Sequence, residues 1–485
     1  MCGFIGIFGE DNCHVVPEVL RGLLSIQHRG QDAAGIITFD EKFHAKKGLG
    51  LVRDVFSRKH LERLTGNLAV GHVRYPTVGA GSEGDVQPFW IDFPLGIAMA
   101  HNGNVTNFLE LKRRYFPERD VHLASECDLE AVLYVFASAI TRERNTKITP
   151  ERVFKAVEEV FQTVRGAYSV VGIIAGHGLF AFRDPYGIKP IIMGKKEGDK
   201  HPSFAVASES VVLDVAGFGE KRDIQPGEVL FIDMQRNVHS SRVEKKPHRP
   251  CIFELVYFAR PDSFLDEVSV YKTRIRLGRA LAEKWKRSGL RADVVIPVPE
   301  SARIAAQSMA LELGLPYREG FVKNRYVGRT FIMPGDEIRR DSIRTKLNTI
   351  PLEFQGKQVL LVDDSIVRGN TSRQLVLLAR RAGAAKVYLA SYSPPLRYPC
   401  PYGIDMSTKK EFIARGRNEE EIAREIAADA VVYQDLDALE ACALKGNPSL
   451  EAFCKACFDG KYPTEDVTEA ILDAIERERT ATRDK

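Results

Sequence analysis

The chain has 485 residues and a mass of 54.2 kDa, a length that predicts two or three domains. Hydrophobic residues make up 44% and charged residues 28% of the chain, which excludes a disordered or low-complexity protein. The net charge of +4, from 69 basic and 65 acidic side chains, is too small to indicate nucleic-acid binding. No apolar run approaches the roughly 18 residues of a membrane-spanning helix, and the N-terminus lacks the pattern of a signal peptide. We therefore expect a cytoplasmic protein that does not bind membranes.

The first half of the chain alternates irregularly between short apolar strands and helices. Periodicity predicts helices over Val16–Gln27, Leu129–Ile140 and Pro150–Val164. Short apolar runs predict strands at Gly3–Phe8, Gly35–Phe39, Leu68–Val73, Gly96–Ala100, Tyr168–Ala175 and Leu179–Phe182. Because several strands follow one another directly, we expect hairpins and a mostly antiparallel α+β layer structure over residues 1–235.

A polar, basic segment with two prolines separates the halves, and we expect a linker over residues 236–250. Beyond it, strands and helices alternate regularly. The expected helices are Val270–Ser288, Ala302–Leu313 and Thr371–Ala382, and the expected strands are Asp293–Pro297, Gln358–Val362 and Lys386–Ala390. This spacing predicts a parallel α/β sheet over residues 251–465, with a ligand site beyond the carboxyl ends of its strands. A single amphipathic helix is expected in the C-terminal segment, residues 466–485.

The cysteine at position 2 is the first candidate for chemistry. Removal of Met1 would make Cys2 the first residue, so that its thiol shares a residue with a free α-amine. Such an amine has an ordinary pKa of about 7.7–8.0 and can accept the thiol proton at working pH. A buried small residue at the start of a strand is the alternative, and position alone favours it.

Polar residues near the ends of other strands add to this candidate. Arg74 lies just beyond a strand, where it could bind a carboxylate in a bidentate manner. Asn102 and Gly103 follow another strand, and a side-chain amide beside a backbone N–H is the donor pair of an oxyanion hole. Asp128 could meet a substrate ammonium group. Each signal alone is weak, because Asn-Gly is usually a turn.

Five segments in this order resemble the glutaminase domain of N-terminal-nucleophile amidotransferases: MCGFIGIFG, QHRGQDAAGI, GHVRYPTVG, AHNGN and FRDPYGIKP. The resemblance implies an αββα sandwich in which Cys2 attacks the side-chain amide of glutamine. It also implies that Arg74 and Asp128 bind the α-carboxylate and α-ammonium groups, while Asn102 and Gly103 stabilise the oxyanion.

The strongest single motif lies in the second half. A buried strand ends in two carboxylates, Asp363 and Asp364, and is followed by a tight turn with Gly369 and a helix that begins near Thr371. Backbone N–H groups at such a helix N-terminus favour a phosphate. A capped helix after solvated acidic residues is the alternative, and the preceding apolar run disfavours it.

This motif resembles the phosphoribosyl pyrophosphate (PRPP) loop of type I phosphoribosyltransferases. The resemblance places Asp363 and Asp364 beside the ribose hydroxyls and Mg²⁺, and it places Ser301, on a second loop, near the same metal. The residues that it assigns to the 5-phosphate and its loop are Ser365, Arg368, Gly369, Asn370, Thr371 and Ser372.

Between these loops lies a segment rich in basic residues, Arg318–Lys346, which we interpret as a lid over the pyrophosphate. Its sequence KNRYVGRTFI, together with CIFELVYFARPDS at 251–263, resembles the amidophosphoribosyltransferases. The chain is identified as a member of this family over nearly its whole length. The family implies the reaction of glutamine, PRPP and water to 5-phosphoribosylamine, glutamate and pyrophosphate, the first step of purine synthesis. It also implies homotetramers and feedback inhibition by AMP and GMP.

Four of the eight cysteines could form one thiolate site: Cys251, Cys400 and the close pair Cys454 and Cys457. Spacing alone leaves zinc and an iron–sulfur cluster open. The iron–sulfur-containing branch of the family has cysteines in these contexts, which implies a structural [4Fe–4S] cluster. The remaining cysteines, Cys13, Cys127 and Cys442, are expected to be ordinary buried thiols.

Two alternatives remain from the sequence. Hexosamine-forming amidotransferases share the glutaminase half, but they carry sugar-isomerase domains instead of a PRPP loop. A non-catalytic PRPP-sensing regulator would not need Cys2, Arg74, Asn102 and Asp128. The chain departs from the iron–sulfur branch in one respect, since its nucleophile follows Met1 directly, and we expect methionine removal alone to mature it.

Overall fold

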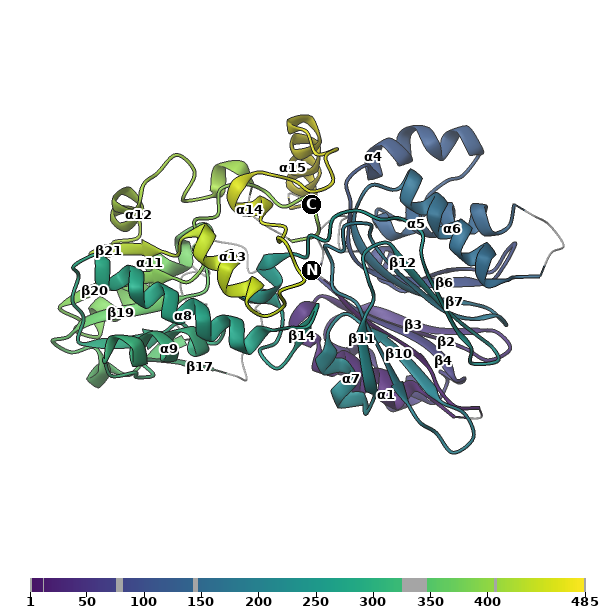
Figure 1. The fold of residues 1–485 in the computed structure, drawn as a ribbon, viewed down its shortest axis with the longest axis horizontal. Coiled ribbons are helices and arrows are strands. Elements are labelled where there is room, and N and C mark those ends of the chain that lie inside the picture. The colour runs from purple at the N-terminus through teal and green to yellow at the C-terminus, as the bar shows by residue number, and fades with distance from the viewer. Residues whose placement is uncertain are drawn as a thin grey trace.

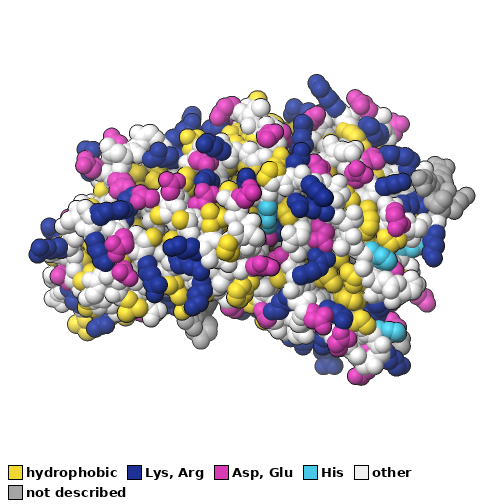
Figure 2. Space-filling view, in the orientation of Figure 1, with side chains coloured by type: hydrophobic (Ala, Val, Ile, Leu, Met, Phe, Trp, Pro, Cys, Tyr) yellow, Lys and Arg dark blue, Asp and Glu magenta, His cyan; other side chains and the backbone are white. Residues whose placement is uncertain are grey.

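The computed structural model describes residues 2–11, 13–75, 82–142, 147–324, 347–404 and 408–483, with side chains up to residue 477. The two halves of the chain lie side by side, and the chain begins where they meet (Figure 1). On the face shown in Figure 2, basic and acidic side chains are interspersed over both halves, so neither sign of charge gathers in one region of this face.

Two antiparallel sheets form the first half within the described ranges. One has seven strands in the order β11-β9-β10-β1-β4-β2-β3, and the other has six in the order β13-β12-β8-β7-β6-β5. The strands of the first are β1 (Gly3–Phe8), β2 (Ala33–Phe39), β3 (Phe43–Leu49), β4 (Leu68–Arg74), β9 (Ile192–Lys196), β10 (Ser203–Ala207) and β11 (Gly219–Asp223). Those of the second are β5 (Phe89–Ile91), β6 (Ile97–Val105), β7 (Gly166–Ile174), β8 (Gly178–Arg183), β12 (Glu228–Asp233) and β13 (Val238–Arg242).

Helices cover the outer face of each sheet. On β1 the side chains alternate, so that Ile5 and Ile7 pack towards α1 (Val16–Ser25) and α7 (Ser210–Ala216), while Phe4 and Phe8 pack between the sheets. The other sheet packs against α5 (Asp128–Ile140) and α6 (Pro150–Thr163). The αββα sandwich is confirmed. Three short helices lie in the connections, α2 (Val52–Val55), α3 (Arg58–Leu61) and α4 (Phe108–Glu110).

Two segments of the first half differ from the sequence-based expectation. The segment expected as a linker contains β13, which pairs with β12 from Glu228↔Arg242 to Ile232↔Val238. The polar residues 101–104, expected to follow a strand, lie inside β6 and pair with β7, with Asn102 opposite Ser169. In both places pairing with a neighbouring strand overrides a local preference for turns.

The second half contains a parallel sheet in the order β16-β19-β20-β21 among the described residues. Its strands are β16 (Val294–Pro297), β19 (Gln358–Asp363), β20 (Lys386–Ser391) and β21 (Ala430–Tyr433). One face packs against α8 (Val270–Arg287), α9 (Arg303–Leu313) and α13 (Leu436–Leu444), and the other against α11 (Asn370–Arg381) and α12 (Glu419–Glu425). The expected parallel α/β sheet is confirmed, and its predicted elements end within two residues of those observed.

The remaining elements of this half are short, apart from the C-terminal helix. They are β14 (Phe264–Leu265), β15 (Val268–Ser269), β17 (Phe321–Lys323), β18 (Leu347–Thr349), α14 (Ala456–Asp459) and α15 (Glu469–Arg483). Among the helices in the described ranges, none combines the length and apolar character needed to cross a membrane. Most of the segment interpreted as a lid, residues 325–346, lies outside the described residues.

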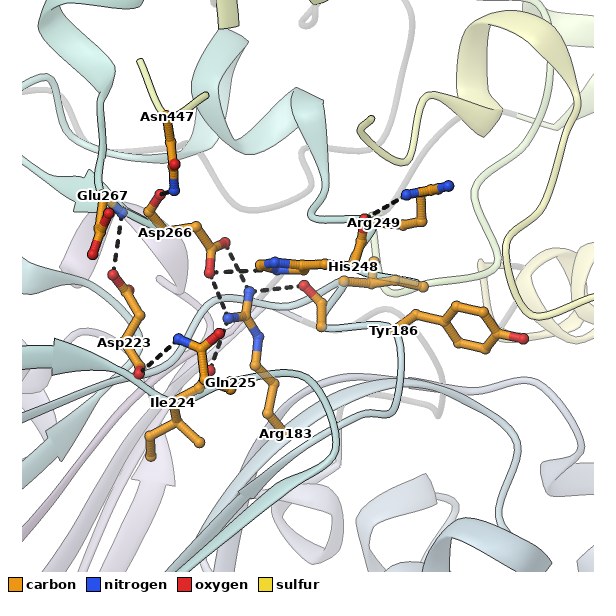
Figure 3. A network of polar contacts seen from close by, with 12 residues as sticks. Arg183, Tyr186, Asp223, Ile224, Gln225, His248, Arg249, Asp266, Glu267 and Asn447 are labelled. Atoms are coloured by element: carbon orange, nitrogen blue, oxygen red, sulfur yellow. Dashed lines mark hydrogen bonds and ion pairs between the residues drawn. The ribbon is translucent and has the colours of Figure 1, made fainter. Parts of the chain in front are cut away.

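A buried ion pair joins the two halves at a boundary shown in Figure 3. Arg183, at the end of β8, binds both carboxylate oxygens of Asp266 at 2.6 and 2.8 Å. Its other N–H groups donate to carbonyl oxygens of Lys189, Ile224 and Gly187. All five guanidinium donors are thereby used, which fixes the loop around Asp266 on the first half.

Candidate functional site

The first candidate site surrounds Cys2, which precedes β1 at the boundary between the halves. The Cys2 side chain is buried, and its sulfur lies 3.7 Å from the carbonyl oxygen of Tyr75, just beyond β4. Its backbone nitrogen donates to Oδ1 of Asn102, on β6, at 3.3 Å. Removal of Met1 would turn this nitrogen into the α-amine, and Asn102 already binds it.

Asn102 fits the role of an oxyanion donor. Its side chain is fully buried, and its Nδ2 has no hydrogen-bond partner in the described part of the chain. A buried donor without a partner costs free energy unless a ligand accepts from it. Gly103 follows with φ of +153°, and a Cβ there would lie 2.0 Å from the carbonyl oxygen of Ala167. Only glycine fits this position, so the conformation next to the oxyanion donor depends on it.

The two residues predicted to bind the α-groups of glutamine are both buried near this site. Arg74 ends β4, and its guanidinium lies 4.0 Å from Asp85. Asp128 begins α5 and accepts from the backbone N–H of Val105 at 2.8 Å, and its other oxygen lies 3.3 Å from Nε2 of His101. Burial alone would raise the pKa of Asp128, but His101, the Val105 N–H and Arg74 together lower it. The carboxylate is therefore ionised and suited to a substrate ammonium group.

Sequence reasoning missed the residues that hold this pair. Gln87 contacts Nδ1 of His101 at 2.9 Å and accepts from the His101 N–H at 2.9 Å, and Asp85 accepts from the backbone N–H of Glu126 at 3.1 Å. Asp85 and Gln87 lie in an irregular segment between strands, where no periodicity signals a role. His101 belongs to a quoted motif, but nothing in its spacing indicated its contact with Asp128.

The second candidate site lies at the carboxyl end of β19. Asp363 is the last residue of the strand, and α11 begins at Asn370 after Gly369, which has φ of +80°. A Cβ on Gly369 would lie 2.3 Å from Cδ1 of Ile413, so this turn requires glycine. Among the predicted phosphate-loop residues, Ser372 is buried, Ser365 is half-buried, and Arg368, Asn370 and Thr371 are exposed around the helix N-terminus. Arg368 lies 3.3 Å from Glu411.

Two buried carboxylates meet at this point with a hydroxyl from the second loop. Asp364 accepts from Ser365 Oγ at 2.5 Å and from the Ser301 hydroxyl, while its backbone N–H donates to Asp363 at 2.8 Å. The pKa of Asp363 is raised by burial and by Asp364, and burial raises the pKa of Asp364 although both serine hydroxyls oppose it. A divalent cation or a ribose diol would offset this cost, and carboxylate and hydroxyl oxygens fit Mg²⁺.

The four cysteines predicted to form one site are all buried, and their backbones lie together. Cys251 and Cys454 form a parallel β-bridge, and the carbonyl of Cys457 accepts from the N–H groups of Arg397 and Tyr398, near Cys400. Burial raises the pKa of Cys251 to about 12 and that of Cys457 well above its usual value, and neighbouring thiols of the set add to both shifts. Four buried thiols in one region fit a thiolate-bound group.

Within the residues described, no three His, Cys, Asp or Glu side chains converge closely enough to hold a single metal ion. Of the three cysteines expected to be ordinary buried thiols, Cys127 and Cys442 are buried, but Cys13 is exposed. Cys13 lies in the loop before α1, where no apolar neighbour in the sequence draws it inward.

Comparison with known proteins supports both halves. Residues 72–214 match a family model described as a glutamine amidotransferase domain. The chain is 48% identical to an amidophosphoribosyltransferase of Pasteurella multocida over 99% of this chain and 96% of that protein. It is also 48% identical to one of Escherichia coli, over 98% and 95% of the two chains.

A solved structure of the B. subtilis glutamine PRPP amidotransferase, complexed with ADP and GMP, is similar over the whole fold. It has a TM-score of 0.84 and 37% identity over 96% of this chain and 98% of that one. The match therefore includes the glutaminase sandwich, the parallel sheet and the order in which they follow one another. On these grounds the chain belongs to the amidophosphoribosyltransferase family.

Proposed function

We propose that this chain releases ammonia from glutamine at Cys2 and transfers it to PRPP beside Asp363 and Asp364. The products are 5-phosphoribosylamine, glutamate and pyrophosphate, the outcome of the first committed step of purine biosynthesis. The observation that carries the first half-reaction is the unpartnered amide nitrogen of Asn102, whose Oδ1 binds the backbone nitrogen of Cys2. Because the large majority of buried polar side-chain atoms have a hydrogen-bond partner, this donor points to an acceptor on a bound substrate.

The glutaminase step follows from these positions. The Cys2 thiol attacks the amide carbon of glutamine, and its proton passes to the α-amine of the mature chain. The amide nitrogen of Asn102 and the backbone N–H of Gly103 donate to the oxygen that becomes negative. The α-amine then protonates the leaving nitrogen, ammonia departs, and water hydrolyses the thioester to glutamate. Arg74 and Asp128 hold the α-carboxylate and α-ammonium groups throughout.

The transfer step takes place at the second site, at the carboxyl end of β19. The N-terminus of α11 and the loop around Gly369 bind the 5-phosphate, and Asp363 and Asp364 orient the ribose hydroxyls. Ammonia attacks the anomeric carbon, and pyrophosphate leaves. We expect the lid, Arg318–Lys346, to close over this site and to keep ammonia from bulk water, which stays a prediction since residues 325–346 lie outside the described chain.

Two bound groups belong to the proposal. Ser301, Asp363 and Asp364 would hold one Mg²⁺ per subunit, which supplies positive charge to the departing pyrophosphate. Cys251, Cys400, Cys454 and Cys457 would hold one [4Fe–4S] cluster per subunit in a structural role, because the reaction moves no electrons. The buried acid pair and the four gathered thiols support these assignments.

Regulation and assembly are proposed from the family. The B. subtilis relative was solved with ADP and GMP, which supports inhibition of this enzyme by purine nucleotides, AMP and GMP among them. A homotetramer and a cytoplasmic location also stay predictions.

The proposed reaction is tested by its stoichiometry in protein purified without oxygen. With glutamine and PRPP, we expect one glutamate and one pyrophosphate for each 5-phosphoribosylamine, and intact mass should show that Met1 is absent. Glutamate release without any pyrophosphate, in the presence of PRPP and Mg²⁺, would contradict the transfer half of the proposal.

A further inference from the structure

Arg29 links the nucleophile to the opposite half of the molecule. It ends the short 3₁₀ turn Gln27–Arg29 after α1, and its side chain is fully buried. Its Nε donates to the carbonyl oxygen of Cys2 at 2.9 Å, and one terminal nitrogen donates to Glu254 at 2.9 Å. Glu254 lies beyond β13, in the segment that leads into the phosphoribosyltransferase sheet. One guanidinium therefore binds the main chain of Cys2 and a carboxylate of the other half.

The Arg29 site is closely packed as well as charged. A Cβ on Gly3 would lie 3.1 Å from Cδ of Arg29, and a Cβ on Gly30 would lie 2.6 Å from the backbone nitrogen of Arg74. Both glycines allow the Arg29 turn to approach the start of β1, next to Cys2, and the end of β4, which carries Arg74. A displacement of Arg29 would therefore reach the nucleophile directly.

The two carboxylates around Arg29 are not equivalent. Glu209 accepts from Arg29 at 2.5 Å, and it also accepts from Ser263 at 2.8 Å and from the backbone N–H of Arg260 at 3.1 Å. Glu254 accepts from Arg29 through Oε1, while its Oε2 is buried with no hydrogen-bond partner among the described residues. Arg29 therefore keeps its ion pair with Glu209 if Glu254 loses its charge, whereas the carboxylate of Glu254 relies on Arg29 for its hydrogen bond.

On its other side Glu254 connects to the acidic pair of the second site. It begins a single π-helical turn, Glu254–Phe258, in which the carbonyl oxygen of Val256 accepts from Tyr392 at 2.8 Å. The backbone N–H of Tyr392 donates to the carbonyl of Asp363 at 3.1 Å. A continuous series of hydrogen bonds and backbone thus runs from Cys2 to Asp363.

We propose that Glu254 is a positioning residue for the glutaminase reaction, acting through Arg29 on the main chain of Cys2. Arg29 binds the carbonyl of Cys2 and Asn102 binds its nitrogen. The two contacts therefore fix the main chain on both sides of Cα, from which the thiol side chain extends. Because one of these contacts depends on a carboxylate from the other half, the geometry of the nucleophile depends on how the halves are docked. This inference rests on the proposed function.

The test compares Glu254→Gln with the wild-type enzyme. We expect the variant to lower the kcat of glutamine hydrolysis by about tenfold, since small displacements of a nucleophile cost at least that much. The KM for glutamine should stay within about twofold, because Arg74 and Asp128 are untouched, and so should synthesis from free ammonia. Labelling of Cys2 by an electrophilic glutamine analogue, followed by intact mass, should slow in parallel with kcat.

A double variant separates positioning from general damage. Arg29→Lys keeps the charge but cannot reach three acceptors, and Arg29→Lys with Glu254→Gln should be no slower than Arg29→Lys alone. Asp266→Asn is the matched control, since it breaks a buried ion pair between the halves that does not touch Cys2. It should leave glutamine kinetics unchanged even where it lowers the melting temperature.

Three results would overturn the inference: unchanged labelling and kcat in Glu254→Gln, the same loss in Asp266→Asn, or fully multiplicative losses in the double variant. If Glu254→Gln does not fold, Glu254→Asp, which keeps the charge and shortens the reach, is judged by the same criteria. Failure of the proposed function itself is distinct, because the wild-type enzyme would then use neither glutamine nor ammonia.

Discussion

The side-chain amide of Asn104 donates to the carbonyl oxygen of Pro401 at 2.8 Å, so that β6 rests on the loop that carries Cys400. In the same contact a Cβ on Gly403 would lie 2.6 Å from the carbonyl oxygen of Gly103. The strand with the proposed oxyanion donors thus packs directly on one of the proposed cluster-binding segments. Damage to that segment should therefore reach the glutaminase site.

The first prediction concerns the cluster. Protein purified without oxygen should contain about four irons per chain, and Cys400→Ser should lose the iron and the glutamine-dependent activity together. Iron and sulfide analysis beside both activity assays checks this. One zinc per chain in place of iron, or full glutamine-dependent activity in an iron-free variant, would contradict the assignment.

The second prediction concerns the oxyanion donor. Asn102→Ala should lower kcat for glutamine hydrolysis by about 10²–10³-fold, the usual cost of removing one such donor. Steady-state kinetics should show little change in KM, since Asn102 is not assigned to the α-groups of glutamine. An equal loss of ammonia-dependent synthesis would place Asn102 outside this role.

The third prediction concerns the acidic pair. Asp363→Asn should lower synthesis by about tenfold or more with either glutamine or ammonia as nitrogen donor, because both routes end at the same sugar site. Pyrophosphate release measured over a range of Mg²⁺ concentrations checks this. If ammonia-dependent turnover survives intact, Asp363 does not belong to the PRPP site.

The fourth prediction concerns pH and the network of Figure 3. Burial and the neighbouring Asp266 raise the pKa of Asp223 to about 7 in the folded chain. Since this lies above the ordinary value, the protonated group stabilises the fold at low pH, and that stability is lost as pH rises through 7. Burial lowers the pKa of His248 to about 4. Because the folded chain keeps this histidine neutral, its contribution makes stability rise with pH between about 4 and 6.5, opposite to that of Asp223.

Asp223→Asn should therefore remove a loss of stability between about pH 4 and 7 that the wild-type chain shows. We expect the melting temperature of the wild type to fall relative to the variant by about 2–4 °C across this interval. The comparison cancels the contribution of His248, which both chains share. Parallel curves for the two proteins would show that Asp223 does not bind the proton.

Several parts of the fold could be predicted because their signals are local. The Val359–Val362 run predicts a buried strand, and the glycine and hydroxyl residues after it predict the turn and the start of α11. The parallel sheet follows from the regular alternation of strands and helices in the second half of the chain. The position of Cys2 and the family motifs were enough to propose candidate residues for a glutaminase site.

Other features depend on contacts between distant segments. The residues 101–104 look like a turn in sequence, but pairing with β7 places them within a strand. Nothing near Arg29 or Glu254 indicates that they meet, since they are 225 positions apart. The role of Gln87 in holding His101 is likewise visible only after folding, because it depends on a contact between a loop residue and a strand 14 positions away.

The most direct test of the account is Cys2→Ala, assayed for 5-phosphoribosylamine with glutamine and with free ammonia. The account predicts no product above background from glutamine and near wild-type synthesis from ammonia, because the sulfur is needed only to release the nitrogen. Continued use of glutamine by this variant, or the loss of both activities in a folded protein, would contradict it.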